Sequence, residues 1–151
     1  MLLTVAAVTA IAAVIAALMP AISRSGQALV QSADVANDRL SSRVEIVQAT
    51  GVVNNTEVLA WAKNTGATTV SAVNKADLFF GTQTDFARIP YDDPGCSAPC
   101  WSYSLENDTQ WNPTSTIKVT VELTDPLQSG ETYYLKMVMP NGIEDTKFFT
   151  L

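Results

Sequence analysis

The side chains with the most distinctive chemistry are two cysteines, Cys96 and Cys100, in the loop sequence DDPGCSAPCW. The chain contains no histidine, and two thiolates alone cannot complete the tetrahedral shell of a zinc site. The spacing in a loop rich in proline and glycine favours a disulfide between Cys96 and Cys100, with two free thiols as the alternative. Because the ring would be short, the bridge would stiffen its loop and stabilise the fold only slightly.

The absence of histidine also removes the usual general base and the usual partner of a nucleophilic serine or cysteine. Carboxylates at Asp77, Asp92, Asp93 and Glu122 could pair across strands or loops, but solvated surface charge explains each of them. No loop carries the D-x-D-x-D spacing of a calcium site, although Asp108 adds a third loop carboxylate. The sequence therefore predicts a protein that is not an enzyme and that uses no metal, cofactor or small-molecule substrate.

Two tripeptides, which begin at Asn54 and Asn107, fit the N-glycosylation pattern N-x-[S/T], and both fall in predicted loops. They are candidate acceptors if the protein is exported. The chain has a net charge of −6, and all its acidic residues follow residue 32. An acidic surface repels phosphate backbones, so we do not expect a nucleic-acid partner.

The chain opens with an apolar segment, residues 1–22, that contains no charged side chain. As a helix it would be about 30 Å long, which matches the hydrocarbon core of a bilayer. A cleavable signal peptide is a weak interpretation because nothing basic precedes Arg24. A plain transmembrane anchor fits the length. The many alanines favour a more specific role, since small side chains let helices pack closely on one another.

The helix is expected to continue beyond this segment. Leu29, Ala33, Ala36 and Leu40 recur at steps of three and four, the period of one helix face. We therefore predict one helix over residues 1–42, about 60 Å long, with a kink or unwound stretch near Pro20 and Gly26. One domain cannot bury such a rod, so its apolar side chains need other copies or a membrane. The side chains expected in such a helical core are Leu2, Leu3, Val5, Val8, Ile11, Val14, Ile15 and Leu18.

The sequence pattern predicts β-strands throughout residues 43–151. In 116–123 the residues Ile117, Val119, Val121 and Leu123 alternate with polar ones, as in a sheet with one face in a core. Trp61 is expected in that core. Further strands are predicted at 44–49, 57–64, 68–73, 76–81, 84–89, 101–106, 132–139 and 144–151, the last two joined by a turn with positive φ at Asn141 and Gly142.

This pattern predicts an α+β fold: a long N-terminal hydrophobic α-helix over residues 1–42, then an all-β, immunoglobulin-like sandwich over residues 43–151. A closed barrel is the alternative.

At this point the residues resemble a known family. The apolar start, the continuation DVANDRLSSRVEIVQATG, the strand segment LAWAKNTGATTVSAV and the terminal SGETYYLKMVMPNG are similar to the archaellin superfamily, including archaellum proteins F and G, within the type IV pilin-like proteins. Bacterial type IV pilins usually carry glutamate at the fifth mature position. Val5 stands there in this chain, as archaellins allow.

The resemblance implies a structural subunit of an extracellular, archaellum-like helical filament that serves motility or adhesion. Identical subunits would bundle their helices in the filament core and expose their β domains, after storage in the membrane before assembly. The alternative is a membrane-anchored accessory or binding module of an archaellum, such as a cell-wall anchor or a filament cap. Unclosed head-to-tail stacking of identical subunits gives a helical filament, which agrees with the first reading.

Overall fold

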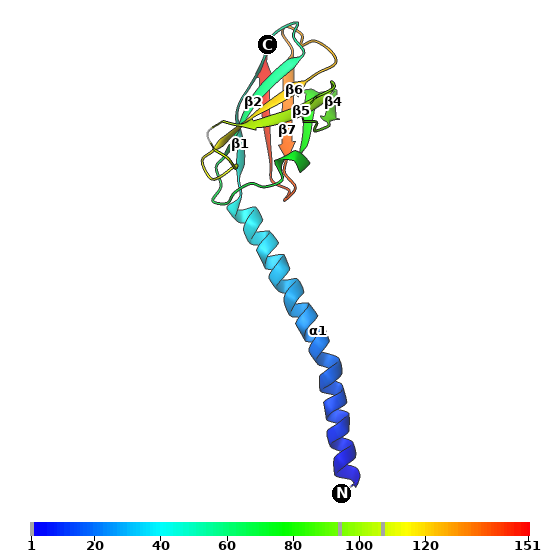
Figure 1. The fold of residues 1–151 in the computed structure, drawn as a ribbon. Coiled ribbons are helices and arrows are strands. Elements are labelled where there is room, and N and C mark those ends of the chain that lie inside the picture. Colours follow the sequence, from blue (N-terminus) through cyan, green and yellow to red (C-terminus); the bar gives the residue numbers. More distant parts are fainter. Residues whose placement is uncertain (1, 94, 107) are drawn as a thin grey trace. The chain divides into compact units, whose positions relative to one another are not determined.

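The computed structural model describes residues 2–93, 95–106 and 108–151, and within the helix the side chains of residues 16, 18–20, 22–37 and 39–41. In this part of the chain one helix precedes two antiparallel sheets, so the predicted α+β fold is confirmed (Figure 1). The elements are α1 (Leu2–Ser41), β1 (Val44–Gly51), β2 (Glu57–Asn64), the 3-10 helix η1 (Val73–Lys75), β3 (Asp77–Thr82), β4 (Phe86–Ile89), β5 (Cys100–Leu105), β6 (Thr116–Glu122), β7 (Thr132–Val138) and β8 (Glu144–Thr150).

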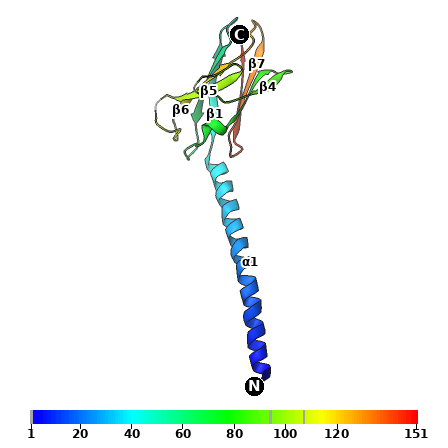
Figure 2. The same ribbon diagram turned by 45° about the vertical axis from the view of Figure 1, so that its right-hand side comes forward.

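The strands form two four-stranded sheets with the orders β1-β2-β6-β5 and β4-β3-β7-β8. Two views show these sheets as two layers of one sandwich (Figures 1 and 2). This arrangement excludes the closed barrel. The chain divides into two compact units, Met1–Asn37 and Asp38–Leu151, so the last turn of α1 belongs to the same unit as the sandwich.

The core between the layers follows the alternation read from the sequence. Ile117, Val119 and Val121 of β6 are fully buried, and Leu78, Leu135 and Met137 face them from the second sheet. The largest buried side chains are Trp101 and Trp111. Trp101 belongs to β5, and Trp111 lies in the segment between β5 and β6.

Trp61 was expected in the core, but it lies on the outer face of β2. The residues of β2 that face inward are Val58, Ala60, Ala62 and Asn64. Ala60 and Ala62 lie opposite Val119 and Ile117 of β6 in the sheet register. The alternation predicted for β2 therefore had the correct period of two, but the prediction placed Trp61 on the wrong face of the strand.

The predicted strand at residues 68–73 is absent. Val70 makes only an isolated bridge to Trp111, Ala72 has a left-handed conformation with φ 54°, and η1 follows. Val70, Val73 and Ala76 are buried at steps of three, which is the spacing of a 3-10 turn rather than the alternation of a strand. This segment covers the core as a loop.

Two further expectations are refined by the structure. Of the kink or unwound stretch expected near Pro20 and Gly26, the unwound stretch is absent, because α1 continues through both residues. In the turn between β7 and β8 only Gly142 has a positive φ, 83°. The Gly142 amide donates to the Met139 carbonyl at 2.8 Å, which fits a type I turn followed by one left-handed residue.

One flank of the sandwich is closed by a side chain. There β1 and β8, the edge strands of different sheets, lie beside each other. The backbone amide of Ile46 donates to Oδ2 of Asp145 at 2.6 Å, where the register of β1 shifts between Ile46 and Gln48. On the other flank, Trp101 of β5 exchanges backbone hydrogen bonds with residues 90 and 92.

Candidate functional site

Helix α1 carries a series of large apolar side chains exposed to solvent in the single chain. They include Leu18, Met19, Ile22, Leu29, Val30, Val35 and Leu40, the last of which is 87% exposed. The predicted face of Leu29, Ala33, Ala36 and Leu40 is exposed at each of these four positions. Large exposed apolar side chains in this number favour an association surface. We call the exposed apolar side chains between residues 18 and 40 the helix surface.

Of the side chains predicted for a filament core, the structure describes only Leu18, which is 52% exposed. Leu2, Leu3, Val5, Val8, Ile11, Val14 and Ile15 lie in α1, but their side chains are outside the described residues. Among the side chains that are described, no helical stretch is both long enough and apolar enough to span a bilayer.

The end of α1 is held by the loop that follows β2. The amide of Ala67 donates to the Ser41 carbonyl at 2.7 Å, and the amides of Thr65 and Gly66 donate to the Arg43 carbonyl at 2.9 and 3.1 Å. A hydroxyl pair, Ser42 Oγ with Thr68 Oγ1 at 2.7 Å, adds a side-chain bond. The last carbonyls of a helix lack partners within the helix, so the Ala67 amide satisfies at Ser41 an acceptor that would otherwise need water.

Asn64 shapes this loop from inside the sandwich. Its side chain is fully buried, and its Nδ2 donates to the carbonyls of Thr68 at 2.8 Å and Trp111 at 3.0 Å. Its Oδ1 accepts the Gly66 amide at 3.0 Å. A buried amide with its donors and acceptor satisfied fixes one loop conformation, because an alternative would leave polar groups unpaired.

Gly66 permits the close approach of the loop to the helix end. A Cβ at this position would collide with the backbone amide of Arg43 and lie 2.7 Å from the Ser41 carbonyl oxygen. Only glycine fits without displacing the backbone. The sequence KNTG thus encodes the junction: Asn64 sets the loop and Gly66 lets it reach the helix end.

A second contact holds the helix end from the other sheet. The Nε of Arg39, in the last turn of α1, donates to the carbonyl of Asn141 in the β7–β8 turn at 2.6 Å. Gly142 leaves space for the guanidinium, since a Cβ there would lie 3.0 Å from Nη2 of Arg39. The residues of the 65–68 loop, together with Arg39 and Asn141, are called the junction below.

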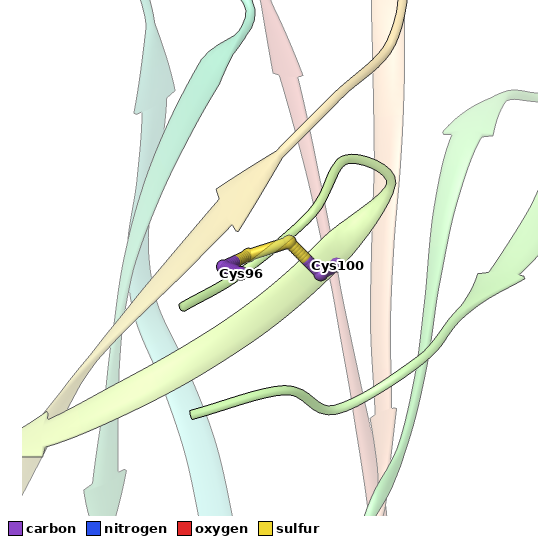
Figure 3. The surroundings of a disulfide bond; sticks show 2 residues. All are labelled: Cys96 and Cys100. Atoms are coloured by element: carbon purple, nitrogen blue, oxygen red, sulfur yellow. A yellow bond between two sulfur atoms is a disulfide. The ribbon is translucent and has the colours of Figure 1, made fainter. Parts of the chain in front are cut away.

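The structure joins Cys96 and Cys100 in a disulfide, with Cα atoms 5.7 Å apart (Figure 3). This separation lies within the usual range. Cys100 is buried at the start of β5, beside Trp101. Tyr91 packs edge-on against Trp101 with ring centroids 4.9 Å apart and donates to Asp93 at 3.3 Å. This contact and burial raise the pKa of Tyr91, burial being the larger cause. The bridge therefore fastens the loop that leads into β5. Tyr91 and Trp101, on either side of this loop, cover one flank of the core.

The structure separates the candidate carboxylates. Asp77 pairs with Arg88 on the outer face of the second sheet, at 2.5 Å, whereas Glu122 lies in the first sheet opposite Glu57. The backbone amide of Asp92 donates to the backbone carbonyl of Trp101. Asp108 accepts from Asn112 Nδ2 at 2.7 Å, and this bond lowers the pKa of the Asp108 carboxyl.

Asn54 is exposed in the β1–β2 turn, where a glycan could be attached without entering the core. Asn107 lies outside the described residues. Among the residues that the structure describes, no group of three or more acidic or cysteine side chains could hold a metal ion.

Sequence reasoning missed the junction. Asn64 was read only as the end of a strand, and Arg39 as part of the polar half of the helix. The signal for Asn64 was present: it occupies an inward position of β2, and a buried asparagine requires partners. No sequence signal indicated Arg39, because its acceptor is a backbone carbonyl 102 residues away.

The fold and the exposed helix surface define a class of protein in which a long N-terminal helix carries a β-sandwich. Comparison with known proteins identifies the family. The chain matches the model of the archaeal-type flagellin family over residues 1–149, and it therefore belongs to that family.

Two relatives support this membership, and a third protein shares the fold. An uncharacterised protein of Archaeoglobus fulgidus is 29% identical over 157 residues, which cover 99% of this chain and 94% of that protein. The archaellum periplasmic stator protein FlaG from Sulfolobus acidocaldarius is 29% identical, with a TM-score of 0.63 over 72% of this chain and 99% of that chain. The archaeal flagellum of Methanospirillum hungatei strain JF1 shares the fold over 99% of this chain and 90% of its own, at 15% identity and a TM-score of 0.65.

The protein is accordingly archaellum-related, with similarity both to a filament flagellin and to a stator protein. Its family consists of structural filament or stator proteins and is not an enzyme family.

Proposed function

We propose that this chain is a structural subunit of an extracellular, archaellum-like helical filament, with residues 1–42 in the filament core and the sandwich of residues 43–151 on the outside. The observation that carries the proposal is the helix surface: apolar side chains from Leu18 to Leu40 are exposed in the single chain. For those beyond residue 22, burial against identical helices removes apolar area from water at about 25 cal/mol per Å². The family match, which includes the helix, supports the same role.

In this proposal the apolar segment of residues 1–22 resides in the membrane before assembly. On assembly, Val8, Ile11 and their neighbours exchange lipid for other helices. Association from lipid depends on close packing of small side chains, because lipid is as apolar as the helices. Asn54 and Asn107 would carry glycans on the filament exterior.

The junction supports the proposal from the side of the sandwich. Hydrogen bonds from the 65–68 loop and from Arg39 fix the last helical turn within the sandwich unit. A helical polymer of identical subunits repeats one subunit structure, and a last turn fixed within the sandwich unit suits such a subunit.

The proposal is tested by replacing Ile11 with aspartate in cells that make the filament. An unpaired charge in lipid or in a packed core costs several kcal/mol, so Ile11→Asp should abolish filaments seen by negative-stain microscopy. Ile11→Leu is the matched control and should retain them. Full-length filaments built from the Ile11→Asp chain would contradict the helix-core model.

A second candidate is a membrane-anchored accessory protein of the archaellum, such as a cell-wall anchor or filament cap. The observation that favours it is the 29% identity with the stator protein FlaG, against 15% with the flagellum. Abundance separates the two roles. Mass spectrometry of sheared filaments should find this chain as a major component if it is the subunit, and should find it absent or scarce if it is an anchor.

A further inference from the structure

The outer face of the second sheet carries a row of aromatic side chains that neither the core nor the junction uses. Phe79 of β3 and Phe86 of β4 have ring centroids 6.5 Å apart, Phe86 and Tyr134 of β7 are 5.3 Å apart, and Tyr134 and Phe148 of β8 are 5.3 Å apart. The row thus crosses all four strands. Phe86 and Phe148 are about half exposed, at 52% and 50%.

The row exists because of strand alternation and one glycine. Gly81 lies in register with both Phe86 and Tyr134. It has no side chain, so the two rings meet across it. A Cβ at Gly81 would collide with the carbonyl of Asp85 and the backbone of Phe86. Cross-strand aromatic pairing stabilises a sheet, which accounts for the contacts between the rings but not for the exposure of Phe86 and Phe148.

The rings border a hollow of about 350 Å³ lined by Asp77, Phe79, Phe86, Tyr134, Lys136 and Val138, called the aromatic hollow below. Its volume falls at the lower end of the range of small-molecule sites, about 300–1,000 Å³. The hollow combines flat apolar surfaces with charged groups at its edge. Such a combination of an apolar lining with a few polar groups is typical of a ligand site.

The charges around the aromatic hollow are paired. Arg88 Nε contacts Asp77 Oδ1 at 2.5 Å, and Lys136 Nζ contacts Glu144 Oε2 at 2.7 Å. The bond to Glu144 raises the pKa of Lys136. The charges of two cations and two carboxylates therefore cancel on this face, although the whole chain carries a net charge of −6. A charged ligand finds no uncompensated partner here, and an uncharged ligand matches the surface.

We propose that the aromatic hollow binds an uncharged saccharide. A pyranose ring presents C–H groups on its faces, which stack on the negative faces of aromatic rings. Its hydroxyl groups at the edge both donate and accept hydrogen bonds, so they can pair with the guanidinium, ammonium and carboxylate groups of the two ion pairs. The site goes beyond the proposed filament role and does not depend on it.

A protein occupant fits less well. A hydrophobic partner would have to desolvate four charged groups without replacing their bonds to water. A stable interface between two copies involves about 20–30 residues a side, whereas the aromatic hollow is lined by six.

The test uses the full chain in a detergent without a sugar headgroup. Isothermal titration calorimetry measures binding of cellohexaose, maltohexaose and N-acetylchitohexaose, with hexagalacturonic acid as the charged comparison. At least one uncharged hexasaccharide should bind more tightly than the acid. Phe86→Ala and Tyr134→Ala should each weaken binding about tenfold, whereas Phe86→Trp should retain it. Val52→Ala, at an exposed apolar position in another part of the sandwich, is the matched control and should bind like the unaltered chain.

Several results would overturn the proposal: no binding of any uncharged probe, equal binding of the acid, or unchanged affinity in both alanine variants. Circular dichroism of each variant shows whether it is folded, and Phe86→Trp keeps a ring in place if Phe86→Ala disturbs the β3–β4 hairpin.

Analytical ultracentrifugation of the same samples measures self-association as a further test. Self-association that Phe86→Ala removes would assign the hollow to a second copy and would also overturn saccharide binding. Filaments retained in the Ile11→Asp test would contradict the filament role without changing saccharide binding, so the two proposals fail separately.

Discussion

Arg39 and Asn141, which are 102 residues apart in the chain, meet where the helix ends and the last hairpin turns. The Arg39 Nε donates to the Asn141 carbonyl oxygen at 2.6 Å. This bond joins the last turn of α1 to the second sheet, whereas the 65–68 loop joins it to the first. The helix end is therefore held by both layers of the sandwich.

Replacing Arg39 with alanine should loosen this end of the helix with little effect on global stability. The bond is exposed, so its loss should lower the free energy of unfolding by about 1 kcal/mol or less. Hydrogen exchange should rise at the Met139–Ile143 turn, measured by mass spectrometry of the folded chain. Arg43→Ala, whose side chain is also exposed, is the control. Unchanged exchange at the turn would show that the Arg39 bond does not order it.

Replacing Asn64 with leucine should be far more damaging. The Gly66 amide and the carbonyls of Thr68 and Trp111 would lose their buried partner, which predicts a loss of about 2–4 kcal/mol in the free energy of unfolding. Urea denaturation followed by tryptophan fluorescence measures it. The exposed residue Asn74 provides the control, and Asn74→Ala should change stability by less than about 0.5 kcal/mol. A similarly small effect at Asn64 would mean that water replaces its bonds.

A fragment that begins at Asp38 should be soluble, rich in β structure and monomeric, because it lacks most of the helix surface. A fragment that begins at Val44 should be less stable by about 2–4 kcal/mol, since it lacks Arg39 and the Ser41 and Arg43 carbonyls that the 65–68 loop bonds. Thermal unfolding by circular dichroism compares them. Equal stability would place the domain boundary after the junction, and filaments formed by either fragment would contradict assembly by the helix.

Stability should fall at alkaline pH through Tyr91. Its pKa is raised in the folded protein, chiefly by burial and also by Asp93. The folded state therefore keeps the phenol proton more tightly than the unfolded state. This contribution is complete below the ordinary pKa of about 10 and is lost as pH rises through the folded value. Urea midpoints measured from pH 8 to pH 11 should decline less in Tyr91→Phe than in the unaltered chain, and identical declines would exclude Tyr91 as the cause.

The sheet architecture was accessible from sequence because apolar and polar residues alternate, as at Ile117, Val119 and Val121. The phase at Trp61 was not accessible, because it depends on which residues from other parts of the chain occupy the core. Trp101 and Trp111 are buried there, and β2 faces inward with Val58, Ala60 and Ala62. An apolar residue alternating on an outer face gives the same local pattern as one on an inner face.

The candidate site, too, could be predicted from the sequence only in part. The helix surface could be predicted from the spacing of Leu29 and Leu40, since that spacing is local. The junction could not, because its bonds join backbone groups to Arg39 and Asn64 from distant parts of the chain. The aromatic hollow depends on the register that places Phe86 and Tyr134 on either side of Gly81, and no local pattern gives that register.

The bond between the Ile46 amide and the Asp145 carboxylate has a consequence for crowded conditions. Edge strands with unpaired amides invite strands of neighbouring molecules to add on, which leads to aggregation. At the flank where β1 meets β8, that amide is occupied by a side chain of the same molecule. Asp145 and Lys147 also place charges along β8. The sheets of neighbouring molecules are therefore hindered from pairing along this flank, even at high protein concentration.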